Sequence, residues 1–343
     1  MTPDFWRGNI EPDLYPLKVM IERDTLIDSA RDDRPVKIKV YYPILEDAHD
    51  KDARNAPARL RANNKGLPLL IWSHGLGGSV DGASFLSRFI ASHGYVVLHV
   101  QHHGTDSSLW EGKPGHPWDI IRSQKIDRAA TLNRFQDTPF VLDIFPKWLN
   151  NHPSIEAVTD LTTMGMSGHS FGSLTTQVMG GMMFPDEKGI LRRNRDTRFK
   201  AGILYSPSPI DHIGLDAPED VYGSIDMPML HMTGTDDSSP VENWDYKKRL
   251  DVYNNITKAK QYLLIINDGD HMVFNGSRGK LGKNPNREKH ETTIKFVALA
   301  YWDAMLKDDK DALNWLNGDG LQNWLKGEGS FTSQQKTQED YNS

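Results

Sequence analysis

A serine between two glycines is the strongest chemical signal in the chain. Ser170 lies in Gly-His-Ser-Phe-Gly (residues 168–172), between an apolar stretch at 161–166 and a helical pattern that begins near Leu174. A strand, a tight turn and a helix in this order form a nucleophile elbow, whose strained serine needs small neighbours. The start of the following helix favours a developing anion. We therefore predict that Ser170 is a nucleophile rather than part of a structural turn.

A glycine-rich segment follows an earlier apolar stretch. It reads Ser-His-Gly-Leu-Gly-Gly over residues 73–78, directly after the predicted strand at 67–72. In enzymes with a nucleophile elbow, one oxyanion donor comes from such a loop and the other from the residue after the nucleophile. We expect the backbone N–H groups of Leu76 and Phe171 to fill these roles. The alternative is a turn that serves packing alone.

An acidic pair follows a later predicted strand, at 227–232. In Gly-Thr-Asp-Asp (residues 234–237), the spacing favours Asp237 as the carboxylate that orients a catalytic histidine. Its neighbour Asp236 is one alternative. Asp211, which follows the preceding predicted strand, is the other.

A histidine after the last predicted strand completes the set. His271 lies in Asp-Gly-Asp-His-Met (residues 268–272), just beyond the apolar stretch at 262–266. The order serine, acid, histidine is the one expected for this type of site. We predict that His271 is the general base. His290 is the nearest alternative, although it lies where a helix is predicted to begin.

Further polar and aromatic residues are predicted at the same sheet edge. His102 and His103 follow the apolar stretch at 95–100, and we expect them, with His74 and Trp110, to contact substrate. His74, His102, His103 and Asp106 also suggest a metal site. They lack regular ligand spacing, so no metal is predicted.

Two other groups of side chains are candidates for the pocket. Trp118 and Phe171 are candidate apolar walls, although aromatic residues more often belong to the core. A basic stretch after His271 could attract anionic substrates, but a solvated loop is the favoured interpretation; it comprises Arg278, Lys280, Lys283 and Arg287.

Alternating apolar strands and amphipathic helices must position these residues. Two antiparallel strands are predicted at 17–27 and 36–42. Apolar and charged residues alternate in the second strand, in Val-Lys-Ile-Lys-Val at 36–40. The later strands are predicted at 67–72, 95–100, 161–166, 201–205, 227–232 and 262–266, and the helices at 83–92, 126–150, 174–183, 241–253 and 291–306. Strands alternating with helices indicate an α/β protein with a mostly parallel sheet of about eight strands and helices on both faces.

Composition bounds the remaining possibilities. The 343 residues have a net charge of −6 and no cysteine, which offers no basic face for nucleic acid and excludes cysteine chemistry. No apolar run is long enough to span a membrane. We expect one domain over residues 1–331, an insertion near 104–125 that covers the site, and a disordered tail at 332–343.

Five segments together resemble a known family. They read PLLIWSHGLGGS, ASHGYVVLHVQHHGTD, MGMSGHSFGSLTTQ, MTGTDDSSP and DGDHMVF. They are similar to bacterial dienelactone-hydrolase-like proteins and, more closely, to relatives grouped with platelet-activating-factor acetylhydrolases. The resemblance covers roughly residues 36–318 and implies the α/β-hydrolase fold.

The resemblance also implies a reaction. It points to a serine esterase that needs no cofactor or metal and hydrolyses small-molecule esters with short or medium acyl chains. True dienelactone hydrolases use a cysteine nucleophile, which this chain lacks. The acetylhydrolases proper take their acid from an earlier position, which keeps Asp211 open. The rival functions are a ligand-binding receptor that keeps the fold, and acyl transfer to an alcohol.

The resemblance bears on localisation as well. The first residues lack the charged start and apolar stretch of a signal peptide. Relatives are often exported, so we expect a periplasmic or secreted mature chain that has been given a new Met1. A cytoplasmic protein is the alternative, and the sequence says nothing of oligomeric state.

Overall fold

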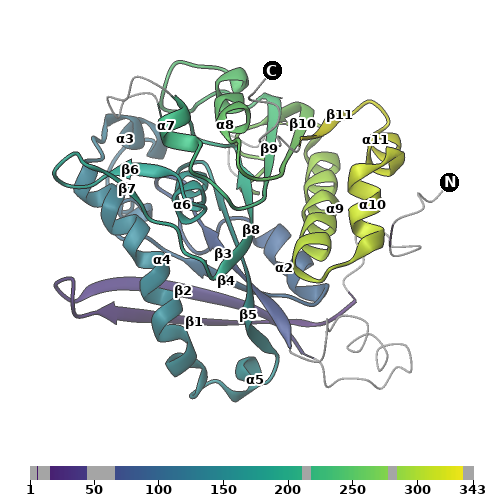
Figure 1. The fold of residues 1–343 in the computed structure, drawn as a ribbon. Helices are drawn as coiled ribbons and strands as arrows, with labels where there is room; N and C mark the ends of the chain where they lie inside the picture. Colours follow the sequence, from purple (N-terminus) through teal and green to yellow (C-terminus); the bar gives the residue numbers. More distant parts are fainter. Residues whose placement is uncertain (1–5, 7–15, 45–65, 211–217, 277–283, 335–343) are drawn as a thin grey trace.

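A nine-stranded sheet runs through the centre of the part of the protein that the structure describes (Figure 1). This computed structural model describes residues 6, 16–44, 66–210, 218–276 and 284–334. The strand order is β1-β2-β4-β3-β5-β8-β9-β10-β11. The strands are β1 Val19–Asp28, β2 Arg34–Pro43, β3 Leu67–Ser73, β4 Val96–Val100, β5 Thr159–His169, β8 Phe199–Tyr205, β9 Met229–Asp236, β10 Gln261–Asp270 and β11 Gly329–Gln334.

The pairing of the strands confirms the predicted mostly parallel sheet. Strands β4, β3, β5, β8, β9 and β10 run parallel, while β1, β2 and β4 pair antiparallel at one edge. The carboxyl ends of the parallel strands therefore meet at one edge of the sheet, where ligands bind in open α/β sheets.

The ninth strand includes the first three residues of the predicted disordered tail, and residues 335–343 lie outside the described residues. Thr332 pairs with Leu263 and Ser333 with Tyr262, so β11 continues past the expected domain end at residue 331. Phe331 packs against the core, and the backbone of β11 satisfies the edge of β10. This polar segment is ordered because its backbone pairs with β10, a contact that its composition does not indicate.

Helices cover both faces of the sheet (Figure 1). They are α2 Ser84–Ser92, α3 Pro117–Ser123, α4 Arg128–Leu149, α5 Pro153–Glu156, α6 Phe171–Met179, α7 Pro218–Tyr222, α8 Leu250–Asn255, α9 Arg287–Leu306, α10 Lys310–Asn317 and α11 Asp319–Leu325, with the 3-10 turns η1 Ser107–Leu109 and η2 Tyr246–Arg249. A small hairpin, β6 Met183–Pro185 and β7 Leu191–Arg193, stands apart from the sheet.

Each face of the sheet has its own apolar core. One core joins the sheet to α2, α9, α10 and α11, and the other joins it to α4, α6, α7 and α8. This arrangement is the α/β-hydrolase fold. Because both cores pack on one sheet, we propose that residues 16–334 form a single domain.

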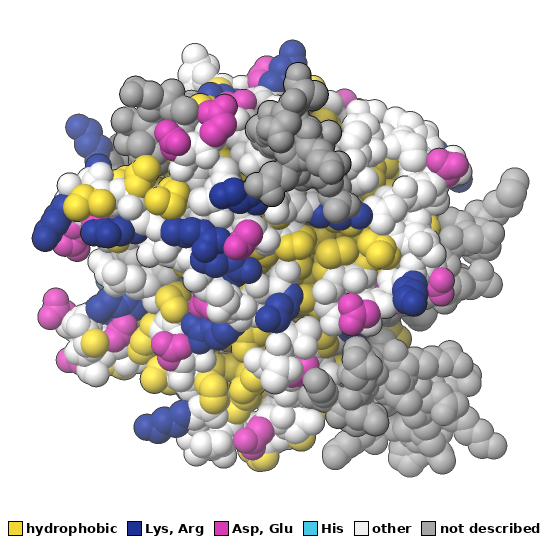
Figure 2. Space-filling view, viewed as in Figure 1, with side chains coloured by type: hydrophobic (Ala, Val, Ile, Leu, Met, Phe, Trp, Pro, Cys, Tyr) yellow, Lys and Arg dark blue, Asp and Glu magenta, His cyan; other side chains and the backbone are white. Residues whose placement is uncertain are grey.

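The surface carries charges of both signs. Figure 2 shows basic and acidic side chains interspersed on the face that carries β7 and α4. Three arginines in or after β7 form ion pairs: Arg192 with Asp186, Arg193 with Asp226, and Arg198 with Asp196. None of the helices within the described ranges is long and apolar enough to cross a bilayer.

Candidate active site

Ser170 occupies the turn between β5 and α6. Its backbone has φ 54° and ψ −118°, a conformation that a non-glycine residue adopts only when its surroundings enforce it. A Cβ on Gly168 would overlap the backbone of Gly172, and a Cβ on Gly172 would overlap the carbonyl of Ser73. The two glycines are therefore required by the close approach of β5, α6 and β3.

Ser170 and His271 both line a cavity of about 1000 Å³. The hydroxyl of Ser170 does not cap the helix that follows it. Ser170 and His271 are not hydrogen-bonded to each other in the described part of the chain. Such contacts are often long in free enzymes and shorten when substrate binds.

His271 and Asp237 form a buried pair. His271 Nδ1 lies 2.7 Å from Asp237 Oδ1, and Asp237 is fully buried. A carboxylate only accepts hydrogen bonds, so Nδ1 carries the proton and Nε2 is the basic atom. Asp237 Oδ2 accepts a second hydrogen bond from Thr233 Oγ1 at 2.9 Å. These contacts orient His271 as a general base requires.

The pair lies at the ends of two neighbouring strands. Asp237 directly follows β9 and His271 directly follows β10, and these strands are parallel. Burial lowers the pKa of His271, opposed by Asp237, and nearby Arg249 lowers it further. His271 is therefore neutral, and able to accept a proton, at neutral pH.

The alternative acids, Asp211 and Asp236, and the alternative base, His290, are not found beside Ser170 in the described part of the chain. Asp211 lies outside the described residues. Asp236 is exposed at the end of β9, and His290 lies in α9 and does not line the cavity. Among the described candidates, only Asp237 and His271 are brought together beside Ser170.

The expected oxyanion donors come from two segments, the loop at 73–78 and the start of α6. Leu76 lines the cavity, and Phe171 is the first residue of α6. The N–H groups of Gly77 and Gly78 donate to Thr105 O and Gly75 O, at 2.9 and 3.0 Å. Within the described ranges, the N–H groups of Leu76 and Phe171 have no such acceptor. They are available to a ligand oxygen.

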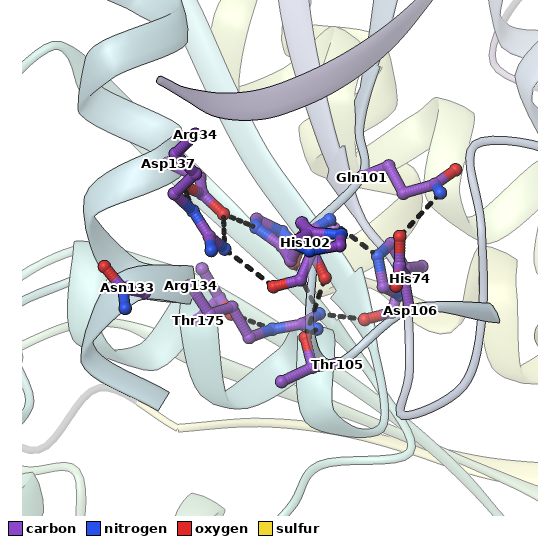
Figure 3. Close-up of polar contacts among 12 residues, drawn as sticks. Arg34, His74, Gln101, His102, Thr105, Asp106, Asn133, Arg134, Asp137 and Thr175 are labelled. Atoms are coloured by element: carbon purple, nitrogen blue, oxygen red, sulfur yellow. Dashed lines mark hydrogen bonds and ion pairs between the residues drawn. The ribbon is translucent and has the colours of Figure 1, made fainter. Parts of the chain in front are cut away.

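The predicted contact of three histidines with substrate does not fit the structure. His74 and His102 are buried, His103 is exposed, and none of the three lines the cavity. His74 Nδ1 donates to Gly75 O at 2.7 Å, and its Nε2 accepts from His102 N at 2.9 Å. Both ring nitrogens of His74 are thus used within the protein (Figure 3). A residue that follows a strand can turn its side chain into the protein interior instead of into the cavity, as His74 and His102 do.

The histidines belong to a buried network centred on Arg134, which the sequence did not reveal (Figure 3). Arg134 reaches from α4 and donates to Thr175 Oγ1, Thr105 Oγ1 and Ser73 Oγ at 2.9, 3.0 and 2.9 Å, and to His74 O. The signal available in the sequence was the helical spacing that places Arg134 on one face with Thr131, Thr138 and Val141. The side chain of Phe171 packs over this guanidinium, 4.6 Å from ring centre to carbon, instead of lining the cavity.

The other end of the network is acidic. His102 Nδ1 donates to Asp137 Oδ2 at 3.1 Å, and Arg34 donates to both oxygens of Asp137. Burial lowers the pKa of His102 to about 4, so this histidine is neutral at pH 7. No group of three or more His, Asp or Glu side chains in the described ranges could hold a metal ion.

The segment at 104–125 contributes residues to the wall of the cavity. Trp110, Trp118 and Ile121 line it, and Trp110 Nε1 donates to Gly77 O at 2.7 Å. Arg122 Nε donates to Pro240 O at 2.8 Å and ties α3 to the loop after β9. Of the basic stretch, Arg287 pairs with Glu291 at 2.7 Å; Arg278, Lys280 and Lys283 lie outside the described residues.

Comparison with known families adds one finding. Residues 45–111 match the model of platelet-activating factor acetylhydrolase, isoform II. The match includes β3, α2, β4 and the loop at 73–78, and thus the half of the site that carries Leu76. It supports hydrolysis of carboxylic esters as the class of reaction. No curated protein matches the chain.

Proposed function

We propose that the protein is a serine esterase that hydrolyses esters with short or medium acyl chains. The observation that carries the proposal is the shared cavity of strained Ser170 and the buried His271–Asp237 pair. The partial family match to an acetylhydrolase supports the same class of reaction.

The first half of the reaction forms an acyl-enzyme. His271 Nε2 accepts the proton of Ser170 Oγ as this oxygen attacks the ester carbonyl. The N–H groups of Leu76 and Phe171 donate to the resulting oxyanion; removing one such donor typically costs about 10²–10³ in rate. Collapse of the intermediate breaks the ester C–O bond, and His271 returns the proton to the leaving alcohol.

The second half releases the acid. Water donates a proton to His271 Nε2 and attacks the acyl carbonyl, and the same oxyanion donors stabilise the second tetrahedral intermediate. Its collapse restores Ser170 with the proton from His271. Asp237 keeps the Nδ1 proton of His271 in place and stabilises the positive charge that develops on the ring.

Hydrolysis of a 4-nitrophenyl ester series, from acetate to palmitate, tests this function. We expect a chain-length optimum below the longest esters, and loss of turnover by about 10⁶ in Ser170→Ala. Ser154→Ala, at an exposed serine of α5 outside the cavity, is the matched control. Turnover that survives in Ser170→Ala would contradict the proposal. Ligand binding without turnover would indicate a receptor, and ester formation with added alcohol would indicate acyl transfer.

A further inference from the structure

A second buried arginine contacts both His271 and Asp237. Arg249 ends η2 and is only 1% exposed. Its Nη2 lies 2.8 Å from Asp237 Oδ1 and 2.9 Å from His271 Nδ1. The predicted catalytic residues do not include Arg249, and nothing in Tyr-Lys-Lys-Arg distinguishes it from Lys247 and Lys248, which are not buried.

The same guanidinium joins the ends of two strands. Its Nε donates to the carbonyl of Asp237 at 2.9 Å, after β9. Its Nη1 donates to the carbonyls of Ser206 and Pro207 at 3.1 and 3.0 Å, after β8. Planar, forked donors suit such a fixed arrangement of acceptors.

The contact between Arg249 and His271 is an approach of two donors. A guanidinium has only donors, and His271 Nδ1 already carries the proton that it gives to Asp237. Both groups therefore donate to Asp237 Oδ1, and their own separation of 2.9 Å is no hydrogen bond. Arg249 thus places a buried positive charge beside the ring that must become positive during the reaction.

Among the residues that the structure describes, three others interact with His271, and none of them is a cation. Asp237 and Asp270 favour the protonated ring. His169 donates from Nε2 to His271 O at 2.8 Å, and burial lowers its own pKa well below the usual value, so it is neutral. Among these neighbours Arg249 alone opposes protonation of His271, acting with burial.

We propose that Arg249 is a positioning residue that holds Asp237 against His271 and extends the esterase activity to lower pH. The inference rests on the proposed function, because it concerns the base of that reaction. Arg249 partly neutralises Asp237 and repels a proton on His271. Only the neutral ring accepts the Ser170 proton, so the acidic limb of the pH–rate profile lies lower than the pair would set alone.

The test is the pH dependence of kcat/KM in Arg249→Met. Removal of a charge within hydrogen-bond distance should raise the midpoint of the acidic limb by about one pH unit or more. The deficit relative to wild type should therefore be largest at acidic pH and shrink on the alkaline plateau. A role limited to folding or strand joining would give the same deficit at every pH.

Three further variants separate charge from geometry. Arg249→Lys keeps the charge but loses the forked guanidinium. The acidic limb of its pH–rate profile should stay near that of wild type, while kcat falls about tenfold. Arg249→Gln keeps donors without the charge, and its limb should rise as in Arg249→Met. Lys248→Met removes a neighbouring cation that pairs with Asp251 and should leave the profile unchanged.

The outcomes are separable from those of the proposed function. If Ser170→Ala abolishes hydrolysis, the function stands, and an unmoved limb in Arg249→Met then overturns the role of Arg249 alone. If Arg249→Met does not fold, Arg249→Gln decides in the same way. A limb that rises as far in Arg249→Lys as in the uncharged variants would also overturn the proposal.

Discussion

Two buried arginines support opposite sides of the same site by different means. Arg134 lies behind the loop at 73–78 and is fully buried, with hydroxyl and carbonyl oxygens as its hydrogen-bond acceptors. Arg249 contacts the acid and the base and is 1% exposed, and its acceptors include the carboxylate of Asp237 as well as backbone carbonyls.

Because their partners differ, the two arginines have different roles: Arg134 holds the loop at 73–78, and Arg249 acts on the His271–Asp237 pair. The partners of Arg134 do not titrate near neutral pH, so this arginine holds the loop in one shape over a wide pH range. Arg249 acts on a pair that changes charge during the reaction. Replacing Arg134 should therefore impair the site equally at every pH, whereas replacing Arg249 should impair it most in acid.

The largest expected effect on turnover comes from removing the carboxylate of Asp237, which contacts Arg249 and has no counterpart among the hydrogen-bond acceptors of Arg134. Asp237→Asn should lower kcat about 10⁴-fold, because the amide does not hold the His271 tautomer that presents a basic Nε2. Steady-state kinetics on the preferred ester measures this loss. Asp236→Asn, at the exposed neighbour, should retain the wild-type rate. An equal loss in both variants would contradict the assignment of Asp237.

The next largest effect is on stability. Arg134→Met should lower the free energy of unfolding by about 3–5 kcal/mol, because it leaves buried oxygens of Ser73, Thr105, Thr175 and His74 without a donor. Urea denaturation measures this change. Arg192→Met, at an exposed pair with Asp186, should cost at most about 1 kcal/mol. Similar losses in the two variants would show that the network contributes little.

The acidic end of the Arg134 network predicts a pH dependence of stability. Burial alone would raise the pKa of Asp137, but hydrogen bonds from Arg34 and His102 hold it below its usual value. Its stabilisation is therefore present above the unfolded pKa of about 4 and is lost as pH falls through the lower folded value. The difference in unfolding free energy between wild type and Asp137→Asn should shrink from pH 7 to pH 3. A constant difference would contradict this linkage.

The smallest effect concerns the cover of the cavity. Trp110→Phe removes the 2.7 Å hydrogen bond to Gly77 O and should lower kcat/KM severalfold, in line with about 1 kcal/mol for one such bond. Trp118→Phe changes the same ring type in the same cavity and should have less effect. If Trp118→Phe lowers kcat/KM as much as Trp110→Phe, the loss comes from the changed shape of the cavity wall and not from the hydrogen bond to Gly77 O.

Local patterns in the sequence were enough to predict the fold. Apolar strands such as β3 and β4 are buried on both faces, so their composition identifies them directly. The motifs around Ser170, Asp237 and His271 follow strands, and the structure brings these residues to one edge of the sheet. Their catalytic roles stay a proposal.

The remaining features depend on contacts between distant segments. Helix α4 continues through Pro139 and Pro146, and its buried face packs against the core, a contact that the local sequence does not reveal. The position of His102 after a strand suggested contact with substrate, but its ring is turned to Asp137 in α4, a partner that lies 35 residues further along the chain. Arg134 and Arg249 have surroundings set by tertiary packing, and neither lies in a recognisable motif.

Labelling with a fluorophosphonate, followed by peptide mass spectrometry, tests the central claim most directly. The account predicts one adduct, on Ser170, formed in step with the loss of esterase activity and absent from Ser170→Ala. Hydrolysis that continues after complete labelling of Ser170, or an adduct elsewhere that abolishes activity, would contradict it.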